Sequence, residues 1–412
     1  RRAAKGGRRL GILPFTPESS GPPSQASPKA PANPTLPRLT PPLPSATILP
    51  MKHSVLFLPL FLSLLPPLSA KADWTIETLA GTGKAGHSGD GGPALEAELD
   101  NPFGIVRGPD GAFYFCEYTG QRIRRLGQDG VLTTIAGTGE VGFTGDGGPA
   151  LQGTFNKPHE IRFDASGDLC IVDMVNHAVR KIEMKTGILS TIAGTGEPGY
   201  SGDGGPAATA QFKEPHSIQF GPGGDLYVCD IGNHVIRRID MSTGKISTFA
   251  GTGRPGPTPD GSPIEGTPLN GPRSLDFDGE GNLWLATREG NQVFKFDLKA
   301  GTIHHIAGTG KSGFTGHGGP AKEAALSGPK GIAIDAEGHV WLADCESHSI
   351  RVIDAKTGRI DLIAGTGKKG DGSDGDPLKC ELARPHGVYA DADGGIYIGD
   401  SEAHKIRVLR RR

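Results

Sequence analysis

The chain has 412 residues, of which 65 are glycine, 34 are proline and 5 are cysteine, and only 6% are aromatic. So much glycine in a chain that is 35% hydrophobic favours short strands joined by tight turns and excludes a coiled coil, and the absence of a three-residue glycine period excludes a collagen. The formal net charge of −2 gives no prior for a nucleic acid or an acidic partner.

The first 50 residues differ in composition from the rest of the chain. A basic stretch, RRAAKGGRRL, is followed by proline, serine and alanine without an apolar period. Such a segment cannot bury a core, so residues 1–50 are expected to be a disordered leader. We interpret it as an over-extended gene model whose true start is Met51; the alternative is a genuine disordered extension.

Residues 51–72 have the pattern of a secretory signal peptide. Lys52 supplies a positive charge, residues 55–65 are apolar, and Ala70-Lys71-Ala72 is a small-residue cleavage site. The apolar run is too short to anchor the chain in a bilayer. We therefore expect a secreted or periplasmic protein with no integral membrane segment after cleavage.

The chain that follows is acidic. From Asp73 onward it has 34 basic and 44 acidic side chains, a net charge of −10. A surface of this sign repels phosphate backbones, so no nucleic-acid partner is expected.

The remaining sequence is a sixfold repeat. The string AGTG recurs every 56 or 57 residues, and so does a proline that opens each unit. The strings begin at Ala80, Ala136, Ala193, Ala250, Ala307 and Ala364, and the prolines are Pro102, Pro158, Pro215, Pro272, Pro329 and Pro385. A period of this length with several short strands per unit indicates a β-propeller. We predict an all-β fold of six four-stranded antiparallel blades over residues 75–412, each blade starting near one of these prolines.

The two ends of the repeat region predict how the ring closes. The copy after Pro385 has only three strands, ending at Leu409, while residues 75–80 form a lone strand with no blade before it. Pairing the two completes the sixth blade and removes the exposed edges of an open sheet.

The repeat resembles the NHL-repeat family of six-bladed propellers. The motif P-x-x-I…G-x-L-Y-V-x-D…N-H-x-I-R…I-x-T-x-A-G-T-G over residues 215–253 carries the resemblance. The loop G-x-x-G-D-G-G-P-A over residues 199–207 is similar to that of an exported bacterial subgroup and of the teneurin NHL domain. The resemblance implies the fold and leaves the activity open, because propellers serve as enzymes, adaptors and scaffolds alike.

Two further repeated features have a structural interpretation. The loop motif Gly-Asp-Gly-Gly-Pro, as in residues 202–206, could offer oxygens to Ca²⁺, but each copy has about one carboxylate. We expect its aspartate to cap its own turn. An acid and an arginine recur together in five blades and are both replaced in blade four, by Thr287 and Phe294, which indicates a salt bridge. The five pairs are Glu117 with Arg124, Asp173 with Arg180, Asp230 with Arg237, Asp344 with Arg351, and Asp400 with Arg407.

The residues after the six prolines are the candidate site, because the first strands of a propeller surround its central channel. In order they are Phe103, His159, His216, Arg273, Lys330 and His386. Five of the six are imidazole or cationic, although the chain from Asp73 onward has a net charge of −10. They could bind a carboxylate or phosphate. Alternatively, His159, His216 and His386 could hold Zn²⁺ with an open position, since a peptidylglycine lyase propeller that resembles this fold uses channel histidines at such positions. The third alternative is that all six only stack between blades and hydrogen-bond the loops.

The remaining histidines and the cysteines carry weaker predictions. His177, His234, His348 and His404 recur at the turn between the second and third strands, where turn capping is expected rather than ligand binding. Cys116, Cys170 and Cys229 are expected to be small core residues. Cys345 and Cys380 could lie in adjacent blades on the mouth side and form a disulfide in an exported protein.

From these features we predict a binding or scaffold module that engages an unknown protein or a small anionic ligand through His159, His216, Arg273, Lys330 and His386. No cofactor is expected, with Zn²⁺ or Ca²⁺ as lesser alternatives. The alternative function is a metal-assisted lyase or lactonase-like hydrolase, and assembly through the inserted loops is a third. Whether the three imidazoles converge discriminates between binding and metal-assisted chemistry.

Overall fold

A computed structural model describes residues 74–412. The predicted leader (1–50) and signal peptide (51–72) lie outside the described residues. The described chain is built of β-strands joined by turns, and its helical pieces are three-residue 3₁₀ turns. The all-β prediction is therefore confirmed.

The strands form six sheets, numbered here as blades 1 to 6 in chain order. Blade 1 consists of β2 (Pro102–Arg107), β3 (Phe113–Glu117), β4 (Arg122–Leu126) and β5 (Leu132–Ala136); blade 2 of β6 (Pro158–Phe163), β7 (Leu169–Asp173), β8 (Ala178–Glu183) and β9 (Ile188–Ala193); and blade 3 of β10 (Pro215–Phe220), β11 (Leu226–Asp230), β12 (Val235–Asp240) and β13 (Lys245–Gly251). Blade 4 consists of β15 (Pro272–Phe277), β16 (Leu283–Thr287), β17 (Gln292–Asp297) and β18 (Thr302–Ala307); blade 5 of β20 (Pro329–Ile334), β21 (Val340–Asp344), β22 (Ser349–Ile353) and β23 (Arg359–Ala364); and blade 6 of β24 (Pro385–Ala390), β25 (Ile396–Asp400), β26 (Lys405–Arg411) and β1 (Trp74–Ala80). Short edge strands, β14 (Ser262–Pro263) and β19 (Gly319–Pro320), extend blades 4 and 5.

The 3₁₀ turns lie in the loops before the blades and after the second strands. They are η1 (Ala94–Glu96), η2 (Ala150–Gln152), η3 (Ala207–Thr209), η4 (Ile231–Asn233), η5 (Ala321–Glu323), η6 (Cys345–Ser347) and η7 (Ser401–Ala403).

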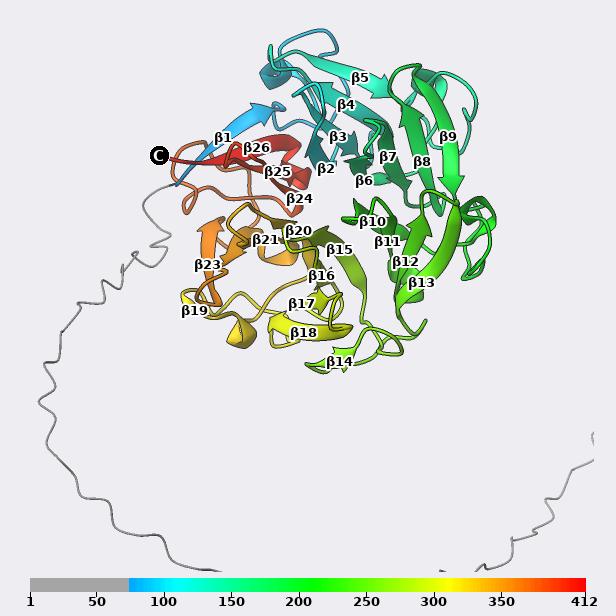
Figure 1. Cartoon of the computed structure of the whole chain (residues 1–412). Coiled ribbons are helices and arrows are strands. Elements are labelled where there is room, and N and C mark those ends of the chain that lie inside the picture. The colour runs from blue at the N-terminus through cyan, green and yellow to red at the C-terminus, as the bar shows by residue number, and fades with distance from the viewer. Residues whose placement is uncertain (1–73) are drawn as a thin grey trace, which may run out of the picture. The chain divides into compact units, whose positions relative to one another are not determined.

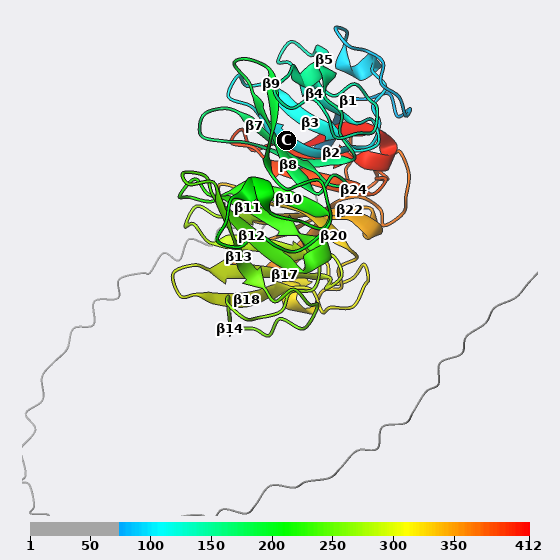
Figure 2. The same cartoon turned by 90° about the vertical axis from the view of Figure 1, so that its right-hand side faces the viewer.

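The six sheets are arranged around a central axis as a propeller (Figure 1). The first strands β2, β6, β10, β15, β20 and β24 contact one another in that order and close the ring from β24 back to β2. Figure 2 shows the same ring from its edge. Because the first strands are innermost and all begin at a blade-opening proline, the starts of these strands surround one mouth of the channel.

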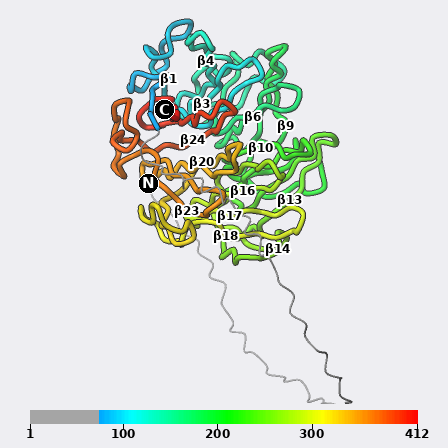
Figure 3. Tube along the Cα trace, turned by 60° about the vertical axis from the view of Figure 1, so that its left-hand side comes forward, coloured from blue at the N-terminus to red at the C-terminus, as the bar shows by residue number. Residues whose placement is uncertain are grey.

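The ring is closed by the first described strand. β1 pairs antiparallel with β26, with Trp74 opposite Arg411 and Ile76 opposite Leu409, and Figures 1 and 3 both show the two ends of the described chain side by side. This confirms the predicted closure. Trp74, Ile76 and Ala80 are buried, so the closing strand also contributes to the core.

The AGTG motif has a steric reason. Its first glycine ends or directly follows the outer strand and has a positive φ, +93° at Gly251, where a Cβ would lie 2.3 Å from the carbonyl oxygen of His234. Only glycine fits so close an approach in a left-handed conformation. The motif thus marks the point where the outer strand passes the turn between the second and third strands.

The inserted loops cover the outer edges of the blades. Pro93, for example, forms a bridge to Val131 at the start of the outer strand, and the same contact appears as paired strands in blades 4 and 5. Ala94, Ala97 and Leu99 are buried with Leu132 of blade 1 and Ile406 of blade 6. The loops therefore fill the space between neighbouring blades, and they shield outer strands that would otherwise be open to pairing.

The predicted acid–arginine pairs are present in all five blades. The closest nitrogen–oxygen distances are 3.1 Å for Arg124–Glu117, 3.3 Å for Arg180–Asp173, 3.9 Å for Arg237–Asp230, 3.3 Å for Arg351–Asp344 and 2.8 Å for Arg407–Asp400. All five arginines are fully buried. Each acid also accepts a backbone N–H from 17 residues earlier, as Asp230 does from Lys213 at 2.7 Å. The pair thereby fixes the segment that leads into the blade.

The loop aspartates do not cap their own turns as predicted. Asp90, Asp146 and Asp203 reach the arginine of the blade that follows, at 2.9, 2.7 and 2.6 Å. Each such arginine is therefore held between two carboxylates, which offsets the cost of burying its charge.

The turn histidines cap their own turns, as predicted, and also join neighbouring blades. His234, His348 and His404 are the C-cap residues of η4, η6 and η7. His177 Nδ1 accepts a hydrogen bond from the backbone N–H of Glu214 in the next blade at 3.0 Å, and His234, His348 and His404 make the equivalent contact. Gln121 and Asn291 do the same with side-chain oxygens in blades 1 and 4. All six residues have φ between 49° and 54°.

The proposed Cys345–Cys380 disulfide is not formed. All five cysteines are free and buried. Cys345 lies against His386, whereas Cys380 packs in a core cluster with Trp74 and Trp341.

Candidate functional site

All six residues that follow the blade-opening prolines line one cavity of about 270 Å³. Each lies at a register shift between the first and second strands, such as the one between Pro215 and Ser217. A bulge redirects the side chain of the extra residue. The repeat thereby turns one side chain per blade toward the channel mouth.

The residue before each proline has a backbone conformation that helps to set the direction of the channel side chain. It has a positive φ in all six blades, for example 52° at Glu214 and 68° at Gly271. The backbone N–H of that residue is the group held by the turn histidine, glutamine or asparagine of the preceding blade. Contacts between blades therefore set where the channel side chains begin.

The lining of the cavity is divided by charge around the ring. Blades 1 to 3 contribute neutral groups, which are Asn101, Phe103, Tyr118, His159 and His216. Blades 4 to 6 contribute Arg273, Arg288, Lys330, Arg384, His386 and Glu402. Since blade 1 lies across the ring from blade 4, a ligand in the cavity would face a cationic wall on one side and a neutral wall on the other.

An aromatic stack fixes the neutral side. The ring of Phe103 is stacked on Tyr118 with centroids 4.3 Å apart, and on His386 with centroids 3.9 Å apart. The ammonium of Lys157 lies 5.3 Å from the centroid of Tyr118. Both faces of Phe103 are therefore covered, and its role is to position its neighbours.

Arg273 is the distinctive cation of the site. It is 3% exposed, and its Nη2 donates to His159 Nε2 at 2.7 Å. Within residues 74–412 no carboxylate lies within 4.0 Å of its guanidinium, whereas Arg124, Arg180, Arg237, Arg351 and Arg407 all have such a partner. Burial, with the nearby charge of Arg288, lowers the pKa of Arg273 to about 10.

The cations of blades 5 and 6 are already paired. Lys330 Nζ lies 2.8 Å from the Glu346 carboxylate. Arg384 donates two hydrogen bonds to the same carboxylate, at 3.0 and 2.6 Å. Arg384 also lies 2.7 Å from Glu402. These contacts, against the opposing effect of burial, lower the pKa of Glu346 to about 2. The uncompensated positive charge of the mouth is therefore concentrated in blade 4.

The three channel imidazoles are neutral. Burial and the neighbouring cations hold the pKa of His159, His216 and His386 well below the usual value. Nε2 of His159 accepts from Arg273, and Nε2 of His386 lies 3.3 Å from Lys330 Nζ. Neutral rings can accept from these donors without adding to the positive charge.

The imidazoles do not converge as metal ligands. His159 and His216 are close, with centroids 4.7 Å apart, but Phe103 stacks on His386 and meets the edge of His159. Two of the three Nε2 lone pairs face cations. In the part of the chain that the structure describes, no group of three histidine, cysteine or acidic side chains is placed to hold a metal ion. This geometry does not favour the metal-assisted lyase or hydrolase.

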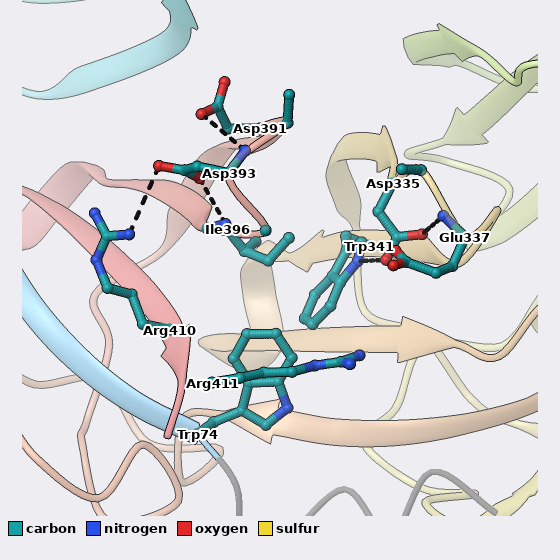
Figure 4. Close-up of a pocket in the computed structure, with 13 residues that line it drawn as sticks. Trp74, Asp335, Glu337, Trp341, Asp391, Asp393, Ile396, Arg410 and Arg411 are labelled. Atoms are coloured by element: carbon teal, nitrogen blue, oxygen red, sulfur yellow. Dashed lines mark hydrogen bonds and ion pairs between the residues drawn. The ribbon is translucent and has the colours of Figure 1, made fainter. Parts of the chain in front are cut away.

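A second cavity, of about 320 Å³, lies between the first turns of blades 5 and 6, at the opposite end of β20 and β24 from the mouth (Figure 4). Two of its acids already have partners: Asp335 accepts from Trp341 Nε1 at 2.8 Å, and Asp393 accepts from Tyr397 at 2.9 Å and pairs with Arg410 at 3.6 Å. Trp74 and Trp341 meet edge to face and are buried. Arg411 lies 5.2 Å from the centroid of a Trp74 ring and is exposed, so its charge stays in contact with solvent, unlike that of Arg273.

Several lining residues were not predicted from the sequence. Arg288 and Glu402 follow second strands and Arg384 precedes a proline, and all three line the cavity. Glu346, which also follows a second strand, pairs with Lys330 and Arg384 of the lining. Comparing the repeats position by position would have shown that acids follow the second strand in blades 4 to 6, at Glu289, Glu346 and Glu402, and in no other blade. This difference between the two halves of the repeat array indicates that charged side chains gather on blades 4 to 6.

No helix among residues 74–412 has the length and apolar character that a membrane crossing requires.

Comparison with known proteins agrees with the fold. Residues 295–382 match the teneurin NHL domain family, and residues 382–409 match the NHL repeat. Among curated proteins, the chain is similar to the chloroplastic protein SUPPRESSOR OF QUENCHING 1 of Arabidopsis thaliana, with 27% identity over 68% of this chain and 27% of that protein. It is also similar to human NHL repeat-containing protein 2, with 25% identity over 63% of this chain and 39% of that protein. The chain thus spans between a quarter and two fifths of the length of these relatives.

A solved structure has the same architecture. An auxiliary nutrient binding protein from Bacteroides thetaiotaomicron superposes with a TM-score of 0.61 and 15% identity, over 82% of this chain and 76% of that one. At this identity the likeness shows the fold alone.

Proposed function

The chain is an NHL-repeat β-propeller, and from that premise we propose that it is an exported binding module whose channel mouth takes a small anionic ligand. The observation that carries the proposal is Arg273, a buried guanidinium that has no carboxylate partner among the described residues. Burying an unpaired charge costs several kcal/mol. A structure that pairs its other buried arginines and leaves this one open to a cavity is suited to a ligand that brings the missing negative charge.

The surrounding charges support the same ligand class. Arg288 also lines the cavity, and its side chain is 45% exposed; its ion pair with Glu289, at 3.5 Å, is solvent-exposed and leaves the guanidinium accessible to a ligand. The mouth is therefore positive in a chain whose described and exported part is acidic overall, and the contrast would steer a small anion to this end of the ring. The nutrient-binding description of a propeller with the same fold and the signal peptide pattern are consistent with a binding role outside the cytoplasm.

The test is ligand-induced thermal stabilisation. Succinate and phosphate, each titrated to millimolar concentration at constant ionic strength, are expected to raise the melting temperature of the wild-type protein. Arg273→Ala is expected to abolish the increase, and Lys330→Ala to reduce it, because Glu346 would then lose one of the cations that compensate its charge beside the mouth. The matched control is Arg238→Ala, an arginine that pairs with Asp225 outside the cavity and whose loss should leave the increase intact. Equal responses in all four proteins would refute the proposal.

A further inference from the structure

The neutral imidazole of His216 adds a hydrogen-bond acceptor to the anion site. Its Nδ1 lies 2.7 Å from the carbonyl oxygen of Glu214. A carbonyl can only accept, so Nδ1 carries the hydrogen, and in a neutral ring Nε2 then carries the lone pair. The tautomer of His216 is therefore set by its own backbone.

This lone pair is available where those of the other two imidazoles are not. Nε2 of His159 faces Arg273, and Nε2 of His386 faces Lys330. For His216, which lines the cavity, the only hydrogen bond within residues 74–412 uses Nδ1. In the described part of the chain its Nε2 therefore has no hydrogen-bond partner, on a ring that lines the cavity.

The acceptor stands beside the cation. His216 lies against His159 with centroids 4.7 Å apart, and His159 is the residue that Arg273 contacts at 2.7 Å. Among the charged groups that lower the pKa of His216, Arg273 has the largest effect. An anion held by Arg273 therefore has a hydrogen-bond acceptor close to its own position.

Resting on the proposed function, we infer that the ligand of the mouth is a hydroxy acid: a small carboxylate with a hydroxyl group on the neighbouring carbon. The carboxylate would pair with Arg273 and Arg288, and the hydroxyl would donate to Nε2 of His216. An amino group in place of the hydroxyl would be protonated, and its charge would be repelled by Arg273, Arg288 and Lys330. The cavity of about 270 Å³ restricts the ligand to a few carbon atoms beyond these groups.

The test compares two probes that differ by one hydroxyl group. Malate and succinate are titrated into the wild-type protein by isothermal titration calorimetry at pH 7.5. One additional hydrogen bond predicts that malate binds about three- to tenfold more tightly than succinate. Equal affinities, or tighter binding of succinate, would overturn the inference while leaving the proposed anion site standing; no binding of either probe would refute both.

Variants of His216 separate the hydrogen bond from packing. His216→Leu removes the acceptor and is expected to bring the ratio of the two dissociation constants close to one, while His216→Gln, which retains a carbonyl acceptor, should keep part of the preference. His304→Leu, on the outer strand β18, is the matched control and should preserve the wild-type ratio. Thermal melts of each variant confirm folding. A preference for malate that survives in His216→Leu would overturn the inference.

Discussion

At the scale of single residues, the buried arginines differ in whether they are paired with a carboxylate. Arg237 lies between Asp230 and Asp203 and is part of the scaffold, while Arg273 lines a cavity and, within residues 74–412, its guanidinium donates to the His159 imidazole and meets no carboxylate. Both are fully or almost fully buried. From this difference in ion pairing we expect Arg237 to contribute to stability and Arg273 to ligand binding.

This difference predicts opposite effects on stability. Arg273→Met removes an unpaired buried charge and is expected to stabilise the free protein by about 1–2 kcal/mol. Arg237→Met leaves Asp230 buried without its partner and should destabilise by about 3–5 kcal/mol. Urea unfolding at pH 7.5 measures both. If the two variants lose stability to the same extent, Arg273 belongs to the scaffold and the distinction fails.

The channel imidazoles predict how stability responds to acid. His159, His216 and His386 have pKa values well below the usual value in the folded protein, whereas the unfolded chain protonates its histidines near pH 6.5. The unfolded state therefore binds more protons below that pH, so the stabilising effect is complete above about pH 6.5 and declines as the pH falls.

Urea unfolding of wild-type protein and His216→Gln between pH 7.5 and pH 5 tests this. The loss of unfolding free energy on acidification should be smaller in His216→Gln, because the unfolded variant takes up one proton fewer. Parallel pH profiles for the two proteins would mean that His216 is protonated in the folded state.

At the scale of the elements, blade 4 shows that the buried ion pair is replaceable. Thr287 and Phe294 stand where the other blades have an acid and an arginine, and both are buried, with the Thr287 hydroxyl donating to the Gln292 carbonyl. Asp260 remains in the loop and accepts instead from the backbone N–H of His305 and from the side-chain Nζ of Lys322. An apolar solution therefore supports the same strand geometry.

Blade 4 thus permits a double-mutant cycle. Thr287→Asp alone buries an unpaired carboxylate and is expected to cost about 3 kcal/mol, and Phe294→Arg alone a similar amount. The double variant should recover at least about 2 kcal/mol of the summed loss, because the new arginine meets both the new acid and Asp260. Chemical denaturation of the four proteins measures the coupling, and additive losses would contradict the view that the pair is a transferable unit.

Which elements could be predicted from the sequence follows from what repeats. The strands recur in six copies and the acid–arginine pairs in five, at a spacing of 56 or 57 residues, so several copies report the same geometry. The ring closure follows from counting strands at the two ends of the repeat region. The contact of Asp203 with Arg237 spans 34 residues and depends on how the loop folds over the blade edge, which no local pattern specifies. The pairing of Lys330, Arg384 and Glu346 occurs once, in side chains from two blades, and has no repeat to reveal it.

At the scale of the whole molecule, stability depends on closing the ring through β1. This strand supplies the outer edge of blade 6 and buries Trp74, Ile76 and Ala80. It also pairs through Ile76 with Gly375 of the loop that covers that edge. The last blade is therefore assembled from segments at both ends of the described chain.

A chain that begins at Gly81 should show the consequence. Without β1, the edge of β26 is unpaired, and we expect a melting temperature lower by more than 10 °C together with self-association through the open edge. Differential scanning calorimetry and size-exclusion chromatography measure these two effects against a chain that begins at Trp74. An unchanged, monomeric protein would show that β1 is dispensable.

The ring also explains why one mouth can bind. Six equivalent positions converge on a single cavity, so any difference between blades becomes a difference between the walls of that cavity. The groups that blades 1 to 3 contribute are neutral, and the charged groups come from blades 4 to 6, so charge is distributed unevenly around the mouth. Glu346 and Glu402 neutralise the cations of blades 5 and 6. The unpaired charge that is left belongs to blade 4.

A crystal structure of the protein grown with malate tests this account most directly. We predict electron density for the ligand in the mouth cavity, with a carboxylate within hydrogen-bond distance of the Arg273 guanidinium and the hydroxyl directed at His216 Nε2. An empty cavity at saturating malate, with Arg273 still bonded only to His159, would contradict it.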